Sequence, residues 1–265
     1  MKKWKSLALA TLTALTMAGA PAEAAPTPEE ARQIDILART ATGDSGWFAA
    51  PEKGEDWTRW MYTVTDLDHD GQLEIFKAKR GGDNAPPWLQ CEELDAGKET
   101  RHYGIYFAGG TDIPDILSSE SAGQSTVLHD ASDDAYHYIF TEVKVLNEFA
   151  RQNTLYALTL SGDLIVEELA ALQGIESGYD GSLSFRYYLP GWRKVEAESG
   201  QPVPPPEEID AERYRNITDE RFPGCEKKVV LFMWLDGERL KAAMDKGQGA
   251  ALLAESYGWF RGDHD

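Results

Sequence analysis

Residues 66–74 concentrate side chains that could bind a metal ion. They read D-L-D-H-D-G-Q-L-E, with carboxylates at Asp66, Asp68, Asp70 and Glu74. Carboxylates this close repel one another, so the run predicts a bound cation that offsets the repulsion. Calcium takes about six to eight oxygen ligands, and a tight loop can supply several of them from alternate positions.

The alternation assigns a role to each residue of this loop. Side chains at i, i+2 and i+4 share one side of a curled strand, so we expect the three aspartates to point at the ion. Gly71 permits the positive φ that wraps the chain around it. Gln72 would offer its backbone carbonyl, and Glu74 would bind directly or through water. The sequence therefore predicts a calcium site made of Asp66, Asp68, Asp70, Gln72 and Glu74.

This run resembles the D-x-D-x-D-G-x-x-[DE] calcium loop of EF-hands, dockerins and integrin-type (FG-GAP) β-propeller repeats. The resemblance covers about nine residues in a single copy, and it implies calcium without implying adhesion or a propeller. An EF-hand needs flanking helices and an acidic residue at loop position 12, where this chain has Lys77 and strand-like flanks. Dockerins and propellers need more than one loop. The strand–loop–strand form of the integrin-type repeats is most similar, and such a single loop is also similar to those of bacterial secreted proteins.

The alternative for the same residues is an acidic β-hairpin in which Asp70-Gly71 forms an ordinary turn. Such a hairpin needs neither Asp66 nor Asp68, whose repulsion would destabilise it. Because position 12 carries no glutamate, we expect a calcium dissociation constant of roughly 0.1–1 mM, as in extracellular modules. A site in that range is filled by external calcium and stabilises the fold instead of acting as a sensor.

The N-terminus has the three parts of a secretory signal peptide. A basic start with three lysines in five residues precedes an apolar stretch over 7–20 and the A-x-A pattern Ala22-Glu23-Ala24. We expect cleavage of residues 1–24 after Ala24, which makes the remaining chain secreted or periplasmic. No later stretch is long and apolar enough to span a bilayer.

Charge and cysteine content limit the partners and the compartment. The formal net charge of −19 argues against binding to nucleic acid or to an anionic membrane, which both need basic patches. It suits a cation ligand, or only solubility. In an oxidising compartment we expect Cys91 and Cys225 to form a disulfide, the alternative being two buried free thiols.

The elements expected around the loop are mostly strands. Thr27-Pro28-Glu29-Glu30 is a capping box that starts an amphipathic helix, which Gly43 ends. Successive runs with short links then predict an antiparallel meander. Large apolar residues alternate with period two in the segments 60–64, 73–75, 103–107, 137–145, 156–160 and 183–189.

The C-terminal part begins after a proline-rich connection at 191–208. Residues 209–216 predict a short helix, Val229–Leu235 predicts one buried strand, and Asp236 is expected to cap the helices that end the chain. The fold class is therefore α+β over a single domain, residues 25–265. It has an antiparallel β-meander body with an N-terminal helix and C-terminal helices.

These features favour an exported calcium-binding protein. The sequence has no G-x-S-x-G, no P-loop and no zinc-ligand spacing of its histidines, so no catalytic activity is evident. One alternative is a secreted or periplasmic hydrolase, acting for example on carbohydrate, with paired carboxylates and tryptophans in a cleft and a structural calcium. The other is a surface interaction module with a contiguous apolar patch outside its core. The sequence identifies no protein or glycan partner.

Overall fold

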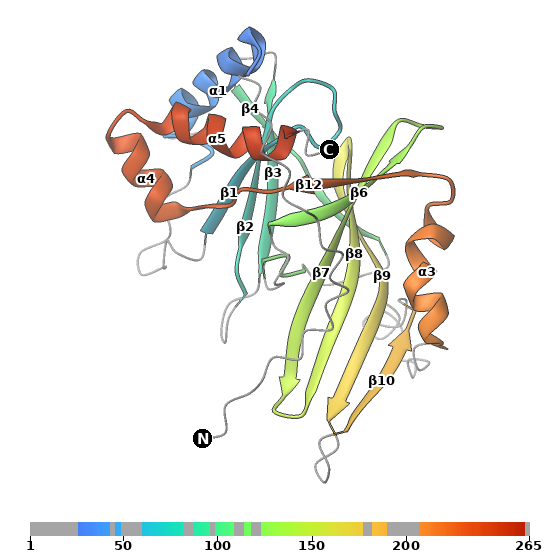
Figure 1. Ribbon diagram of the computed structural model, residues 1–265. Coiled ribbons are helices and arrows are strands. Elements are labelled where there is room, and N and C mark those ends of the chain that lie inside the picture. Colours follow the sequence, from blue (N-terminus) through green and yellow to red (C-terminus); the bar gives the residue numbers. More distant parts are fainter. Residues whose placement is uncertain are drawn as a thin grey trace, which may run out of the picture.

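The computed structural model describes most of the chain after the predicted signal peptide, and residues 1–24 themselves lie outside the described part. The strands form two sheets and the helices lie toward the two ends of the chain, which confirms the α+β class (Figure 1). The proline-rich connection also lies outside the description up to residue 206. The described residues are 26–42, 46–48, 60–81, 87–95, 99–108, 114–117, 123–176, 182–189 and 207–262.

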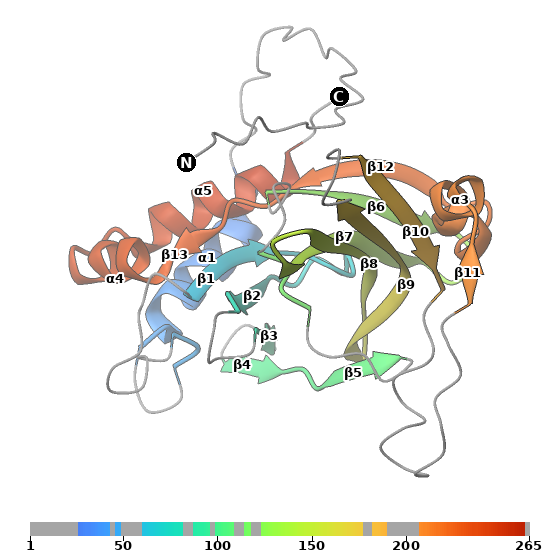
Figure 2. The ribbon, with the colours of Figure 1, turned by 90° about the horizontal axis from the view of Figure 1, so that it is seen from below.

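The first sheet has five strands in the order β13-β1-β2-β3-β4, and all its pairs are antiparallel. Three helices accompany it: α1 packs against α5, and both α4 and α5 contact β1 (Figure 2). The strands are β1 (Trp60–Thr65), β2 (Glu74–Lys79), β3 (Trp88–Asp95), β4 (Glu99–His102) and β13 (Leu235–Asp236). The helices are α1 (Pro28–Thr40), α4 (Gly237–Asp245) and α5 (Gly249–Arg261).

The second sheet has eight strands, seven of them in the order β11-β10-β9-β8-β7-β6-β12, and it curves strongly in Figure 2. β5 joins it by a parallel pairing with β9, and helix α3 (Ala211–Arg221) packs against β9 and β10. The strands are β5 (Ile105–Ala108), β6 (Gln124–Asp130), β7 (Ala135–Asn147), β8 (Ala150–Ser161), β9 (Asp163–Glu176), β10 (Leu183–Tyr188), β11 (Glu208–Ile209) and β12 (Glu226–Leu231).

The predicted meander is present in β1 to β4 and again in β6 to β10, where sequence neighbours pair. The single buried strand predicted over Val229–Leu235 is wrong. The chain there belongs to two sheets, because β12 ends at Leu231 and β13 begins at Leu235. β12 is an edge strand, so Val229 is 51% exposed, while the crossing residue Phe232 is buried in the core.

Local signals at the helix ends are confirmed. Thr27 caps α1 through the predicted box: its hydroxyl accepts from the Glu30 amide (3.2 Å), and the Glu30 carboxylate accepts from the Thr27 amide (2.6 Å). Asp236 caps α4 by accepting from the Arg239 amide (2.8 Å). Helix α1 ends at Thr40, and the predicted stop at Gly43 lies outside the described residues.

One hydrophobic core joins the two sheets. Its buried members include Tyr62 and Phe76 from the first sheet, Tyr138 and Leu158 from the second, and Tyr257 from α5. A smaller cluster lies beneath α3 around Ile217. Because the connection from β1 to β2 emerges beside the main cluster, the predicted ion loop lies where α1, α5 and both sheets come together.

The expected disulfide between Cys91 and Cys225 is wrong, since both cysteines are free thiols. Cys91 lies in β3 and is completely buried within the core of the five-stranded sheet. Cys225 directly precedes β12 in the other sheet, in the electrostatic field of Asp130 and Asp133. One thiol therefore lies in the five-stranded sheet and the other just before an edge strand of the eight-stranded sheet. The expected compartment does not predict this separation.

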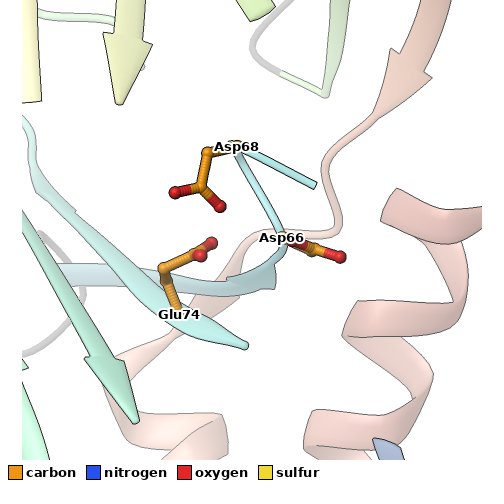
Figure 3. Close-up of side chains that lie close together, drawn as sticks. All are labelled: Asp66, Asp68 and Glu74. Carbon is orange, nitrogen blue, oxygen red and sulfur yellow. The ribbon is translucent and has the colours of Figure 1, made fainter. Parts of the chain in front are cut away.

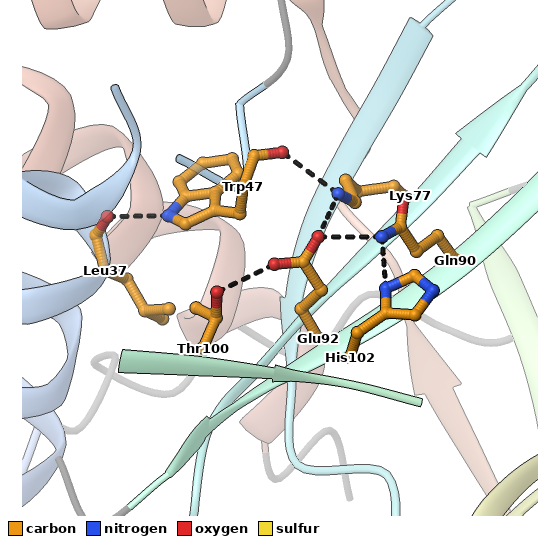
Figure 4. Close-up of polar contacts among 7 residues, drawn as sticks. All are labelled: Leu37, Trp47, Lys77, Gln90, Glu92, Thr100 and His102. Atoms are coloured by element: carbon orange, nitrogen blue, oxygen red, sulfur yellow. Dashed lines mark hydrogen bonds and ion pairs between the residues drawn. The ribbon is translucent and has the colours of Figure 1, made fainter. Parts of the chain in front are cut away.

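A buried ion pair crosses β2 and β3. Lys77 pairs with Glu92 and also donates to the Trp47 carbonyl (3.0 Å), as Figure 4 shows. Glu92 additionally accepts from the side-chain Nε2 of Gln90 (2.8 Å) and from the Thr100 hydroxyl (2.8 Å). Burial lowers the pKa of Lys77, and the Glu92 carboxylate opposes that shift. This network ties the 46–48 segment to the five-stranded sheet.

Candidate metal centre

The predicted ion loop connects the paired ends of β1 and β2, where Thr65 is opposite Glu74. Residues 66–73 separate the two strands, so the loop is much longer than the two-residue Asp70-Gly71 turn of an ordinary hairpin. Three of the predicted ligands come together: oxygens of Asp66, Asp68 and Glu74 lie within 4.8 Å of one another. In Figure 3 the carboxylates of Asp68 and Glu74 face each other, and Asp66 lies beside them at the end of β1.

Glu74 is the most unusual member of this cluster, because it is fully buried. Its Oε2 accepts from the Leu67 amide (2.8 Å) and from the Thr65 hydroxyl (3.0 Å). Its Oε1 is buried and has no hydrogen-bond partner among the described residues. Burial, reinforced by the charges of Asp66 and Asp68, raises the pKa of Glu74 well above its usual value. Buried polar atoms nearly always have a partner, so this oxygen is suited to a cation.

Asp66 and Asp68 are half-buried and only weakly hydrogen-bonded. The Gly71 amide donates to Asp66 (3.3 Å), and the Asp70 amide donates to Asp68 (3.3 Å). Burial raises the pKa of Asp66 to about 7, with further contributions from the neighbouring charges of Asp68 and Asp70. Burial and Asp70 also raise the pKa of Asp68. All three clustered carboxylates therefore disfavour the charged form unless a positive charge is supplied.

Asp70 and Gln72 lie at the outer side of the loop and are not part of the three-carboxylate cluster. Asp70 is exposed, and its carboxylate accepts from the Gln72 amide (2.7 Å) and from the Gln72 side chain (3.3 Å). Gly71 has φ of 85°, the left-handed conformation expected of it. The roles of Asp70 and of the Gln72 carbonyl as ligands stay predictions.

Two residues far away in the sequence hold the backbone of the loop. Gln33 of α1 is buried, donates to the Gly71 carbonyl (2.8 Å) and accepts from the Leu73 amide (2.8 Å). Tyr138 of β7 donates to the Leu67 carbonyl (2.9 Å). The sequence analysis missed both. The available signal for Gln33 was a polar residue one turn before Leu37 on the buried side of α1, and for Tyr138 there was none.

A surface depression lies outside the three-carboxylate cluster. This shallow depression of about 420 Å³ lies between α4 and α5 and is lined by one carboxylate, Glu255, and no tryptophan. It therefore lacks the paired carboxylates and aromatic residues of a glycosidase cleft. None of the helices in the described part of the chain combines the length and apolar character needed to cross a bilayer.

An apolar surface lies at the far end of the long strands β7 to β10, which we call the apolar end. Each of its five side chains is about half exposed or more. Two of them come from β10, where the Phe185 ring lies against Gly174 of β9. The apolar end consists of Val145, Leu146, Phe149, Leu183 and Phe185.

Comparison with protein-family models, with curated proteins and with solved structures found no match for this chain.

Proposed function

We propose that this protein is an exported calcium-binding protein in which residues 66–74 hold one Ca²⁺ ion. The observation that supports the proposal best is the buried, unpartnered Oε1 of Glu74, which lies in a group with Asp66 and Asp68. A cation there would satisfy that oxygen and would neutralise carboxylates whose charged forms are otherwise disfavoured. The proposal of export is supported only by the signal-peptide pattern predicted for residues 1–24.

Calcium fits the donor set better than other common metals. The clustered donors are all carboxylate oxygens, whereas zinc and copper sites use thiolate or imidazole ligands. Magnesium requires near-ideal octahedral geometry and a small site. A loop with one fixed, buried ligand in Glu74 and an exposed one in Asp70 allows the larger and more variable coordination of calcium, with water completing the shell.

The role that we assign to the ion is structural. Asp66 and Glu74 lie at the two ends of the loop, so one ion bound by both would hold the ends of β1 and β2 at a fixed distance. With a dissociation constant of roughly 0.1–1 mM, millimolar external calcium keeps such a site occupied. The ion then stabilises the folded state by binding it and not the unfolded chain.

Calcium is expected to raise the melting temperature of the purified protein, and Asp68→Ala is expected to abolish the increase. A few millimolar calcium over a submillimolar dissociation constant stabilises by about 1–2 kcal/mol, or about 2–6 °C for a chain of this size. The measurement is a thermal melt in EDTA, in calcium and in magnesium.

The control variant for this melt is Asp245→Ala, which removes an exposed carboxylate paired with Lys241 on α4. It also deletes one negative charge, but it should keep the full response to calcium. Equal melting temperatures in EDTA and calcium for the unmutated protein would refute the ion site.

The apolar end favours a second candidate function, an interaction surface, and we infer a second copy of this chain as its occupant. The net charge of −19 makes two copies of this chain repel each other over most of their surfaces. Around the apolar end, positive and negative side chains are nearly equal in number. They are Lys144, Arg151 and Arg186 against Glu148 and Glu176. Apolar contact between two such ends avoids the repulsion that other faces would bring.

The double variant Val145→Ser/Phe185→Ser is expected to sediment as a monomer at concentrations where the unmutated protein sediments as a dimer. Both replaced side chains are more than half exposed (67% and 52%), so the fold should tolerate the change. Sedimentation velocity measures the difference, and an unchanged calcium response shows that the variant is folded. A monomeric unmutated protein would refute this candidate.

A further inference from the structure

The ion loop belongs to the five-stranded sheet but makes polar contact with the eight-stranded sheet. The Tyr138 hydroxyl of β7 donates to the Leu67 carbonyl (2.9 Å) and lies 3.3 Å from Nε2 of His69. Tyr138 is only 1% exposed. Its hydroxyl is therefore a buried polar group whose partners, as described, are supplied by the loop.

His69 adds an aromatic connection to the same junction. Its ring centroid lies 4.0 Å from that of Tyr136 on β7 and 6.1 Å from that of Phe260 on α5. The His69 backbone has φ of 57°, a conformation that a residue with a side chain keeps only when its surroundings hold it. The curled loop thus places one ring against two distant elements.

Helix α1 connects the loop to α5 by a second route. Gln33 binds the Gly71 carbonyl and the Leu73 amide, which fixes the second half of the loop. One turn earlier on the same helix, Glu30 accepts from the Tyr257 hydroxyl (3.0 Å) and from Arg261 (2.7 Å) of α5. Both contacts are long-range, so neither survives unless the loop and helices keep their relative positions.

From these contacts, and resting on the proposed calcium site, we infer that the ion controls the packing of β7 and α5 across the junction between the two sheets. Without the ion, nothing bridges Asp66, Asp68 and Glu74, and the loop opens more readily. Opening withdraws Leu67 and His69 from Tyr138 and loosens the aromatic contacts with Phe260. Calcium favours the curled loop, and the same equilibrium then orders the elements that it touches.

Hydrogen exchange of the purified protein in EDTA and in calcium tests this inference. We expect calcium to slow exchange by roughly tenfold or more in 136–140 of β7 and 257–261 of α5, as well as in 66–74. Exchange in 143–153, at the far end of β7 and β8, should not change. Slowing confined to 60–79 would overturn the inference, although the ion site itself would stand.

The variant Tyr138→Phe tests whether the Tyr138 hydroxyl couples the ion loop to β7. The variant keeps the buried ring but removes the hydroxyl, so it should still bind terbium or calcium at the loop while losing the slowing of exchange in 136–140 of β7. The matched control is Tyr156→Phe, which removes a buried hydroxyl that bonds Glu142 in the same sheet (3.2 Å) and should retain the distant effect. Undiminished slowing in Tyr138→Phe would contradict the route through Tyr138.

Binding and exchange together separate the two proposals. Terbium luminescence or calorimetry that detects no ion in the unmutated protein refutes the calcium site, and the inference fails with it. Ion binding without distant slowing refutes the inference alone. Magnesium serves as the control ion in both measurements.

Discussion

Glu74→Gln is expected to abolish calcium-dependent stabilisation and to leave the ion-free protein at least as stable as the unmutated one. Glutamine has the same shape as glutamate, so its carbonyl can still accept from the Leu67 amide and the Thr65 hydroxyl. Its amide group then occupies the position of the unpartnered Oε1 and can donate toward Asp66 or Asp68. Replacing a buried charge by a neutral donor removes repulsion, but it also removes a ligand for calcium.

The expected loss of calcium affinity is at least about 100-fold, which corresponds to about 2.7 kcal/mol. Calorimetric titration measures it, and urea unfolding in EDTA and in calcium gives the two stabilities. Only the free energy of unfolding measured in calcium should fall. A Glu74→Gln variant with an undiminished calcium response would contradict the role of Glu74, and strong destabilisation in EDTA would contradict the repulsion argument.

The stability of the ion-free protein is expected to fall as pH rises. In the ion-free protein the pKa of Asp66 is raised to about 7 and that of Glu74 is raised well above its usual value. These two carboxyl groups bind protons more tightly in the folded protein than in the unfolded chain. The stability that they contribute is therefore complete below about pH 4 and is lost as pH rises toward 7 and beyond. Calcium reverses the slope because it binds the deprotonated carboxylates. Glu74→Gln should flatten both dependences.

Lys77→Met is expected to lower the free energy of unfolding by about 3–5 kcal/mol. The substitution leaves the Glu92 carboxylate buried without its cationic partner, and it removes the donor to the Trp47 carbonyl. Both side chains are almost fully buried, at 5% and 10% exposed, so water cannot replace the lost contacts. Urea denaturation followed by tryptophan fluorescence measures the change.

The double variant Lys77→Met/Glu92→Leu separates the cost of an unpaired charge from the cost of altered packing. We expect it to be more stable than Lys77→Met alone, because it leaves no buried charge behind. Lys241→Met is the matched control: it breaks the exposed pair with Asp245 and should cost less than about 1 kcal/mol. A Lys77→Met variant within that same small range would show that the buried pair does not stabilise the fold.

Local signals in the sequence predicted the elements whose structure depends on nearby residues. The capping box at Thr27, the cap at Asp236 and the positive φ of Gly71 all follow from contacts within a few residues. The alternation that predicted β1, β2, β7, β8 and β10 is local as well. β9 was missed because Leu, Glu and Ala dominate it, and pairing with β8 and β10 outweighs their weak preference for strands.

The candidate metal centre likewise has some features that the sequence predicts and others that only the tertiary structure shows. By itself, the sequence determined a loop with four closely spaced carboxylates, and three of them, Asp66, Asp68 and Glu74, come together in the structure. Only the tertiary structure decided that Glu74 is buried with one oxygen unpartnered, that Gln33 and Tyr138 hold the loop, and that the two cysteines are free thiols. Each of these features depends on contacts between residues far apart in the chain, and no local sequence pattern predicts such contacts.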